Sequence, residues 1–285
     1  MDGILIVNKE QNWTSNDVVQ KVKRITGEKV GHTGTLDPLA TGVLPLLIGK
    51  GTLLSKYLVN HDKTYIAKVK LGIKTDTADL EGEAIKKVDV DDSVFDEKNI
   101  REVLKSFEGK QKQTPPMYSA IKIKGKKLYE YARSGKNVDV PARNIEIYEM
   151  ELIDFDRNEN EIEFKVSCSK GTYIRSLCED IAKKLGNIGT MSNLNRIRVG
   201  EFKIEDSITI NEAQEIDLNK KIITIENFFE NKDKIELSNR DLKLFLNGVK
   251  LTRKEDEDIY RIYCNNSFIG IGVVSKEYLK REIVV

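Results

Sequence analysis

The stretch GHTGTLDPLATGVLPL, from Gly31 to Leu46, has a composition that suits neither a plain helix nor a plain strand. Gly31, Gly34 and Gly42 surround a single aspartate, Asp37, and an apolar run follows. Glycine frees the backbone at points where regular structure would fix it. The stretch therefore predicts a shaped loop that displays the carboxylate.

Asp37 has two interpretations on local residues alone. An Asp-Pro pair is often a helix N-cap followed by proline at the first helical position. A carboxylate on an irregular loop, flanked by Thr33 and Thr35, is also how a nucleophile or general base is displayed. Both interpretations stay open at this point.

The composition is that of a soluble globular protein, with 39% hydrophobic and 33% charged residues. A chain of 285 residues is long enough for about two domains and a sizeable core. The net charge of +1 balances 47 basic against 46 acidic residues. Any surface that binds a polyanion therefore has to come from local segregation of charge.

Several classes of site are not supported by the sequence. The three cysteines, Cys168, Cys178 and Cys264, and the two histidines, His32 and His61, lack metal-ligand spacing, so we expect no metal site and reduced cytosolic thiols. The chain has neither a complete P-loop nor a dinucleotide-binding glycine motif. No apolar run approaches the roughly 20 residues of a membrane span, and we expect no targeting segment.

Strands and helices alternate in the expected structure. Residues 3–10 read as a buried strand, and residues 14–27 read as a helix capped by Thr14 or Ser15. Residues 64–72 and 161–169 alternate apolar and polar side chains, which predicts two half-buried strands that are neighbours in a sheet.

Two further helices are predicted over residues 93–109 and 171–186. The first has Ser93 and Asp96 as a capping pair. The second has a regular apolar stripe, and Arg175 lies one residue off that stripe near the helix N-terminus. The helix macrodipole disfavours a cation there, so this arginine requires another role.

Residues 110–129 are strongly basic. Six lysines precede the first acidic residue, Glu130, and Tyr118 and Tyr129 are interleaved with them. A lysine-rich loop is commonly a solvated surface, whereas aromatic rings among lysines suit a groove that follows a nucleic-acid backbone. After about residue 220 a short helix and several short strands predict a β-rich module that packs on the larger domain.

Four blocks in this order, 31–46, 63–83, 113–135 and 166–177, resemble the signature motifs of the TruB family of tRNA pseudouridine-55 synthases. The C-terminal module is similar to a PUA-type RNA-binding domain. The resemblance implies an α+β fold with a mixed or antiparallel sheet flanked by helices. It also implies a catalytic domain over residues 1–230 with a basic thumb at 112–143, followed by a small β-barrel-like domain over 231–285.

The family reaction breaks the N1 glycosidic bond of a uridine, rotates the base and rejoins it through C5, so the resemblance implies no cofactor, metal or triphosphate. Asp37 matches the catalytic aspartate, acting as nucleophile or base. Arg175 matches its partner, and we expect the guanidinium to lower the pKa of Asp37 and keep it ionised. Tyr65 matches the tyrosine that stacks on the target base, although its strand position also suits ordinary core.

Four other residues are assigned to substrate binding by the resemblance. His32 matches the residue that enters the space left by the extruded base. Leu194 matches a leucine of the base pocket, and Lys9 and Tyr173 match further binding positions. The implied partner is the T-arm of tRNA, bound in the cytoplasm by a monomer that needs no protein partner and no membrane.

The sequence departs from the family pattern at three positions. Glu10 and Asn12 stand where proline and glycine are usual, and Asn195 stands where an arginine is usual. Asparagine tolerates a left-handed backbone, so we expect the turn at Asn12 to survive. Two rival interpretations are a catalytically idle RNA-binding or RNA-folding protein, and a guide-RNA-dependent pseudouridine synthase.

Overall fold

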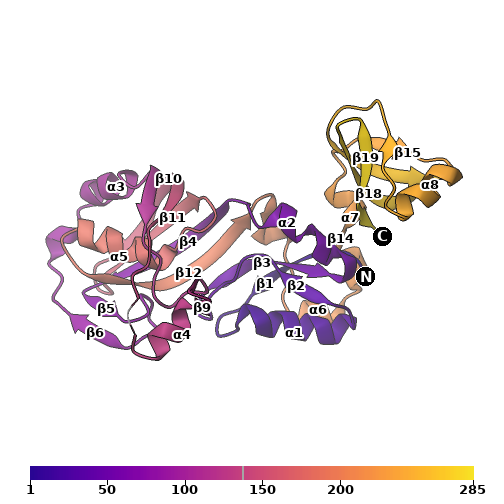
Figure 1. Ribbon diagram of the computed structural model, residues 1–285. Helices are drawn as coiled ribbons and strands as arrows, with labels where there is room; N and C mark the ends of the chain where they lie inside the picture. The colour runs from indigo at the N-terminus through magenta and orange to yellow at the C-terminus, as the bar shows by residue number, and fades with distance from the viewer. Residues whose placement is uncertain (137) are drawn as a thin grey trace.

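A mixed sheet of ten strands forms the centre of the fold in the computed structural model, which describes residues 1–136 and 138–285 (Figure 1). Its main path is β14 (Ile223–Thr224), β1 (Gly3–Lys9), β3 (Thr41–Ile48), β12 (Gly189–Val199), β4 (Lys63–Leu71), β11 (Glu161–Cys168), β10 (Arg143–Asp156) and β7 (Gly109–Gln113). In addition, β2 (Val30–His32) pairs with β3, and β13 (Phe202–Lys203) pairs with β12.

The junction between β3 and β12 makes the sheet mixed. These two strands run parallel and pair at two positions, Thr41 with Asn195 and Gly42 with Arg196. The strand pairs on either side, β1 with β3 and β12 with β4, are antiparallel. The predicted α+β fold with a mixed sheet is therefore confirmed, and the loop before β3 lies at this junction.

Helices α1 (Ser15–Thr26), α3 (Glu97–Lys105) and α5 (Ile174–Lys184) share one apolar core with the sheet. Thr14 caps α1, as predicted, and Gly27 ends it in a left-handed conformation. The predicted apolar stripe of α5 is buried, as are the inward side chains of β4 and β11, which are neighbours as expected.

The start of α3 differs from the prediction. This helix begins at Glu97, where the Asp96 side chain accepts a hydrogen bond from the Asn99 backbone N–H. Ser93 lies in a preceding 3-10 turn that is capped by Asp91. Two capping aspartates in succession divide the predicted helix, because the backbone is extended at Asp96.

A second apolar core covers the other face of β1 and β3. It contains Ile4, Ile6, Val43 and Leu47 of these strands, and Leu58 of α2 (Ser55–Leu58). From the C-terminal part of the chain, it also receives Ile225 of α7 (Ile225–Phe228), Phe229, Ile271 and Ile283. The C-terminal module therefore packs on the larger part of the protein, as expected.

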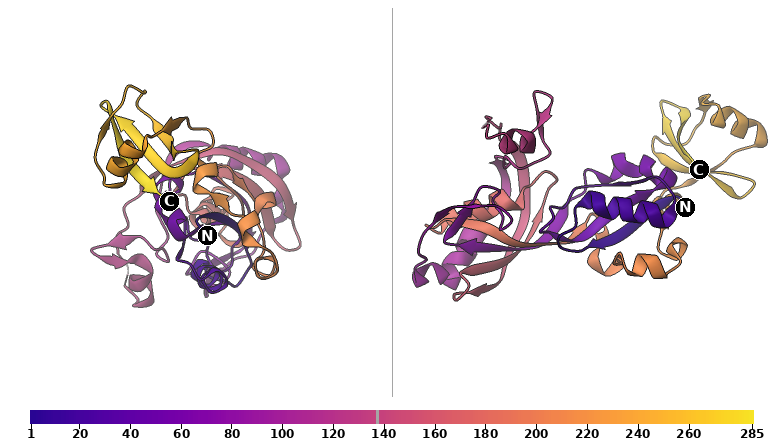
Figure 2. Two further views of the ribbon diagram at one scale, coloured as in Figure 1. Left: turned by 90° about the vertical axis from the view of Figure 1, so that its right-hand side faces the viewer. Right: turned by 90° about the horizontal axis from the view of Figure 1, so that it is seen from below.

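The C-terminal module is a curled five-stranded sheet at one end of the molecule (Figure 2). Its order is β15 (Lys234–Glu236), β17 (Ile259–Cys264), β18 (Ser267–Ser275), β19 (Tyr278–Val284) and β16 (Leu251–Thr252), with α8 (Asn239–Leu246) beside it. It has a core of its own around Phe245 and Ile262. The division at residues 230 and 231 and the PUA assignment stay predictions.

The thumb is an excursion between β7 and β10. It contains β8 (Lys122–Ile123), β9 (Lys126–Lys127) and α4 (Leu128–Arg133), which project from the sheet (Figure 2). Residue 137 of the predicted thumb lies outside the described residues. A second hairpin, β5 (Ile73–Thr75) with β6 (Ala84–Lys87), follows β4. Across 1–136 and 138–285, no helix is both long enough and apolar enough to cross a membrane.

Candidate active site

Residues 33–40 form the irregular loop that the glycine spacing predicted, and it displays Asp37. The flanks were predicted wrongly, because both ends of the quoted stretch are strand, in β2 and β3. Gly42 has φ +105°, and a Cβ there would lie 2.2 Å from the carbonyl oxygen of Arg196. Glycine is therefore required where β3 meets β12.

The N-terminal part of the chain holds this loop from beneath. Ser15 Oγ accepts a hydrogen bond from the backbone N–H of Leu36 at 2.8 Å and donates to the Leu36 carbonyl at 3.0 Å. The N–H of Asn12 donates to the Pro38 carbonyl at 2.9 Å. Asn12 has φ +67°, so the expectation that asparagine preserves this turn is confirmed.

Lys9 lies beneath the loop and does not line the pocket described below. Its side chain is fully buried. Its ammonium donates three hydrogen bonds, to the carbonyls of Trp13 at 2.7 Å, Glu10 at 2.9 Å and Pro38 at 3.2 Å. Burial lowers the pKa of Lys9 to about 8. This geometry supports the loop, and the substrate-binding role implied by the resemblance stays a prediction.

Arg175 connects the loop to the rest of the site. Its Nε lies 3.0 Å from Asp37 Oδ2, and its Nη1 lies 3.7 Å from Asp79 Oδ2. Nη1 also donates to the Thr77 carbonyl at 3.0 Å, and Nη2 donates to the Tyr118 carbonyl at 2.8 Å. The arginine thus holds together the Asp37 loop, the segment after β5 and the base of the thumb.

The pKa of Asp37 is set by opposing influences, of which burial, Arg175 and Asp79 are the three largest. Burial raises its pKa above the usual value, Arg175 opposes that rise, and the nearby Asp79 carboxylate adds to it. The net pKa is raised. Arg175 lowers the pKa of Asp37, as expected, but desolvation of the carboxylate outweighs the attraction of the guanidinium, so the pKa is not brought below its usual value.

A cavity of about 300 Å³ lies over the Asp37–Arg175 pair. Its walls come from the loop, β4, β12, the start of α5 and the thumb. The lining residues are Thr35, Leu36, Asp37, Tyr65, Tyr118, Ser119, Ala120, Tyr129, Thr172, Tyr173, Ile174, Arg175 and Leu194. The structure thus brings together five of the seven predicted site residues, and Lys9 and His32 are not among the lining residues.

The aromatic walls of the cavity are held firmly. Tyr65 is only 7% exposed, and burial raises the pKa of its hydroxyl to about 12. Tyr173 exchanges two hydrogen bonds with the side chain of Gln113, which accepts from the Tyr173 N–H at 2.8 Å and donates to its carbonyl at 3.0 Å. Leu194 is buried in β12 opposite Ala67.

His32 lies in β2, where it pairs with Leu46. Its ring is half-buried, and within the described chain no group hydrogen-bonds to its Nδ1. Burial and the positive charge of Arg196 lower the pKa of this histidine, so it is neutral at pH 7. Its proposed entry into RNA stays a prediction.

Sequence reasoning missed two charged residues of the site, Asp79 and Arg196. Both are buried, at 3% and 1% exposure. Asp79 stands in a polar segment, and Arg196 follows Asn195 in a strand with little alternation, so neither has a local signal. Charged side chains are seldom fully buried, and only their place in the fold distinguishes these two.

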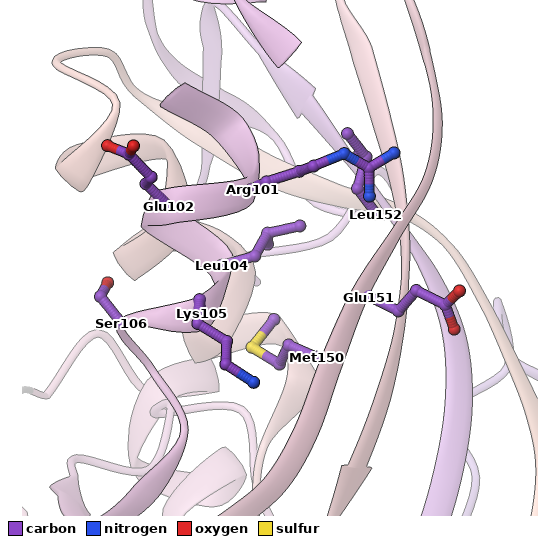
Figure 3. Close-up of a pocket in the computed structure, with 8 residues that line it drawn as sticks. All are labelled: Arg101, Glu102, Leu104, Lys105, Ser106, Met150, Glu151 and Leu152. Atoms are coloured by element: carbon purple, nitrogen blue, oxygen red, sulfur yellow. The ribbon is translucent and has the colours of Figure 1, made fainter. Parts of the chain in front are cut away.

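A larger hollow of about 580 Å³ lies between α3 and β10 (Figure 3). Leu104 and Met150 point into the space between the helix and the strand, whereas Glu102 and Glu151 point away from it. Its lining residues include no salt bridge with a buried arginine such as that of Arg175 with Asp37, so the smaller cavity is the candidate site. In the chain as described, no cluster of three or more His, Cys, Asp or Glu side chains could hold a metal ion.

The match to a family model and to a solved structure places this mixed-sheet α+β fold in the class of pseudouridine synthases. Residues 22–174 match the TruB family pseudouridylate synthase N-terminal domain, and residues 175–225 match the tRNA pseudouridylate synthase B C-terminal domain. The chain belongs to the TruB family.

Curated relatives match along nearly the whole chain. The protein of Clostridium tetani named tRNA pseudouridine synthase B is 45% identical over 98% of both chains. The protein of the same name from Francisella philomiragia is 39% identical, covering 100% of this chain and 97% of its own. In a solved Cbf5-Nop10-Gar1 complex, a chain with a TM-score of 0.66 is 27% identical, with 95% of this chain and 78% of that chain covered.

Proposed function

We propose that this protein isomerises uridine 55 in the T-loop of tRNA to pseudouridine. The observation that carries the proposal is the Asp37–Arg175 pair, joined at 3.0 Å beneath a cavity walled by Tyr65 and Tyr173. The names of the curated relatives support tRNA as the substrate. A cavity of about 300 Å³ is suited to one extruded nucleotide rather than to a duplex.

The reaction needs a carboxylate next to a flipped nucleotide. The C1′–N1 bond breaks, the base turns, C1′ bonds to C5, and the proton leaving C5 is balanced by one gained at N1. Asp37 is the nucleophile or base of this sequence, and Arg175 orients its carboxylate through the 3.0 Å contact. Tyr65 and Leu194 hold the base, because both side chains line the cavity over Asp37.

The thumb supplies the electrostatic attraction for RNA. Its lysines at 122, 124 and 126 are exposed, and Tyr118 and Tyr129 face the cavity. Phosphates of the T-arm neutralised by these lysines would release counterions, so binding weakens with added salt. His32 enters the stack when uridine leaves it, and its neutral ring suits that apolar space.

We also propose that the enzyme works in the cytoplasm as a monomer, without guide RNA or a protein partner. The thumb block, residues 113–135, resembles that of the stand-alone bacterial type. The match to bacterial relatives over 98% of both chains supports the same conclusion. Its three cysteines are buried and free, which suits a reducing compartment.

One experiment tests this function. Purified protein is mixed with an unmodified tRNA transcript labelled with tritium at C5 of uridine, with no other component, and tritium release is measured. We expect release from the wild-type transcript and none from a transcript with cytidine at position 55. Binding without release would favour the idle RNA-binding alternative, and release only after addition of a guide RNA would favour the guide-dependent one.

A further inference from the structure

Arg196 is a charged side chain buried at the junction of the sheet. It is 1% exposed and is the largest fully buried side chain among the described residues. In the described residues it forms no salt bridge with a carboxylate. Burying a charge is costly unless hydrogen bonds satisfy it. Its partners therefore indicate why it is there.

The guanidinium of Arg196 contacts both sides of the catalytic loop. Its Nη2 donates to the Gly34 carbonyl at 3.0 Å, before Asp37, and its Nε donates to the Val43 carbonyl at 2.8 Å, after it. The Arg196 backbone also pairs with Gly42. One side chain thus fixes the distance between the two ends of the loop that carries the carboxylate.

The same guanidinium faces the base-stacking tyrosine. Arg196 and Tyr65 are directly opposite one another on β12 and β4. The Tyr65 hydroxyl lies beside the guanidinium, whose positive charge opposes the rise in the tyrosine pKa caused by burial. Arg196 is therefore the shared neighbour of the loop of Asp37 and of Tyr65, although it does not line the cavity.

We propose that Arg196 is a positioning residue, which fixes the Asp37 loop and the Tyr65 ring relative to one another through the three groups that its guanidinium contacts. This inference rests on the proposed function. The guanidinium donors are spread over a rigid plane that reaches carbonyls on both sides of the loop, and the single nitrogen of a lysine side chain does not reproduce that spread. A displacement of about 1 Å in a catalytic group can reduce a rate by about a hundredfold.

Arg198 provides a matched control on the same strand. The register shift between Arg196 and Arg198 directs this second arginine elsewhere: it donates to Thr64 Oγ1 at 3.1 Å and to the Gly200 carbonyl at 3.0 Å. Replacing it by lysine removes a comparable pair of hydrogen bonds from β12 and leaves the catalytic loop untouched.

The test compares Arg196→Lys with Arg198→Lys. Near-UV circular dichroism gives the folded fraction, and the single-turnover rate at saturating enzyme and the Kd for tRNA are measured on the folded protein. We expect Arg196→Lys to lower the rate about ten- to a hundredfold with a Kd within about twofold of wild type. Arg198→Lys is expected to keep the wild-type rate. Equal rates in the two variants, or a loss confined to Kd, would overturn the proposal.

Amide hydrogen exchange supplies a readout that does not depend on activity. We expect faster exchange over residues 33–40 in Arg196→Lys and unchanged exchange there in Arg198→Lys. Unchanged exchange over 33–40 in Arg196→Lys overturns the positioning role, even if the rate falls. An inactive wild-type protein overturns the proposed function instead, and the exchange comparison still decides whether Arg196 holds the loop.

Discussion

Arg175 forms a salt bridge with Asp37, with 3.0 Å between Nε and Oδ2, and its side chain is only 7% exposed, while the aspartate side chain keeps 36% exposure. The two partners are therefore unequal. The arginine is fixed by protein carbonyls, and the carboxylate retains a face toward the cavity. An ion pair of this kind orients the acid without covering it, which is the arrangement that a reacting carboxylate requires.

Asp37→Asn should abolish turnover, by more than about a thousandfold, because the amide lacks the charge and the nucleophilicity of the carboxylate. We expect the stability of the fold not to decrease. The pKa of Asp37 in the folded state lies above the usual 3.8, so its favourable contribution to stability is present below that pH and lost as the pH rises through the folded-state pKa. At neutral pH we therefore expect an unchanged or higher Tm, and a lower Tm would contradict the assigned burial cost.

Arg175→Met should move the acid limb of the pH–rate profile to higher pH. The guanidinium is the main group that opposes the raised pKa of Asp37, so its loss lets burial raise that pKa further. The rate at the plateau should also fall, by about a hundredfold, since the carboxylate loses its orientation. The measurement is single-turnover pseudouridine formation across the acidic range, and an unmoved limb would argue against the pair.

Asp79→Asn should shift the same limb in the opposite direction. The Asp79 carboxylate raises the pKa of Asp37, so removing its charge lowers that pKa. The Thr77 and Tyr118 carbonyls still hold Arg175. We expect a smaller loss of plateau rate than in Arg175→Met. A shift in the same direction for both variants would show that the limb reports a different group.

Gly42→Ala should destabilise the fold strongly, by about 2–4 kcal/mol, because its new Cβ would meet the backbone of Arg196 at 2.2 Å and its φ is +105°. Gly27→Ala is the control. Gly27 also has positive φ, at +70°, but nothing lies within 4 Å of the added carbon, so we expect a loss of about 1 kcal/mol from backbone strain alone. Urea unfolding compares the two, and equal losses would exclude the close approach as the cause.

Replacing the thumb lysines Lys122, Lys124 and Lys126 by alanine should weaken tRNA binding and lower the slope of log K against log salt. Each phosphate contact that is lost is expected to reduce the slope by about 0.7–0.9. The single-turnover rate at saturation should be unchanged. Filter binding over a salt series measures this effect.

The control for the thumb variant removes the same number of charges from another surface. Lys98, Arg101 and Lys105 are exposed on α3, which lies apart from the thumb and α4 (Figure 1). We expect their replacement by alanine to leave the salt slope unchanged. Equal slopes in both variants would mean that net charge, rather than the thumb, attracts the RNA.

Regular periodicity made much of the fold predictable. The Thr14 cap, the stop at Gly27 and the alternation in β4 and β11 each express a local rule, and the structure follows them. The same reasoning did not predict β3 (Thr41–Ile48). This strand is buried on both faces, so its apolar and polar residues do not alternate. The predicted start of α3 was wrong for another local reason: Asp91 and Asp96 each cap a separate helical segment.

The candidate site was predictable where a residue was out of place locally. Asp37 among glycines and Arg175 at a helix start are both unusual, and their side chains form a salt bridge. Asp79 and Arg196 were missed because their roles depend on burial and on strands far apart in the sequence. The net pKa of Asp37 could not be derived from its partner alone, since desolvation is a property of the finished fold.

The supports of the Asp37 loop come from distant parts of the chain: Lys9 and Ser15 near its start, and Arg175 and Arg196 well after its midpoint. During translation Asp37 therefore leaves the ribosome after Lys9 and Ser15 but long before Arg175 and Arg196. A nascent or prematurely terminated chain that stops before β12 would carry Asp37 in a loop that lacks its contacts with Arg196. We expect such fragments not to modify cellular RNA.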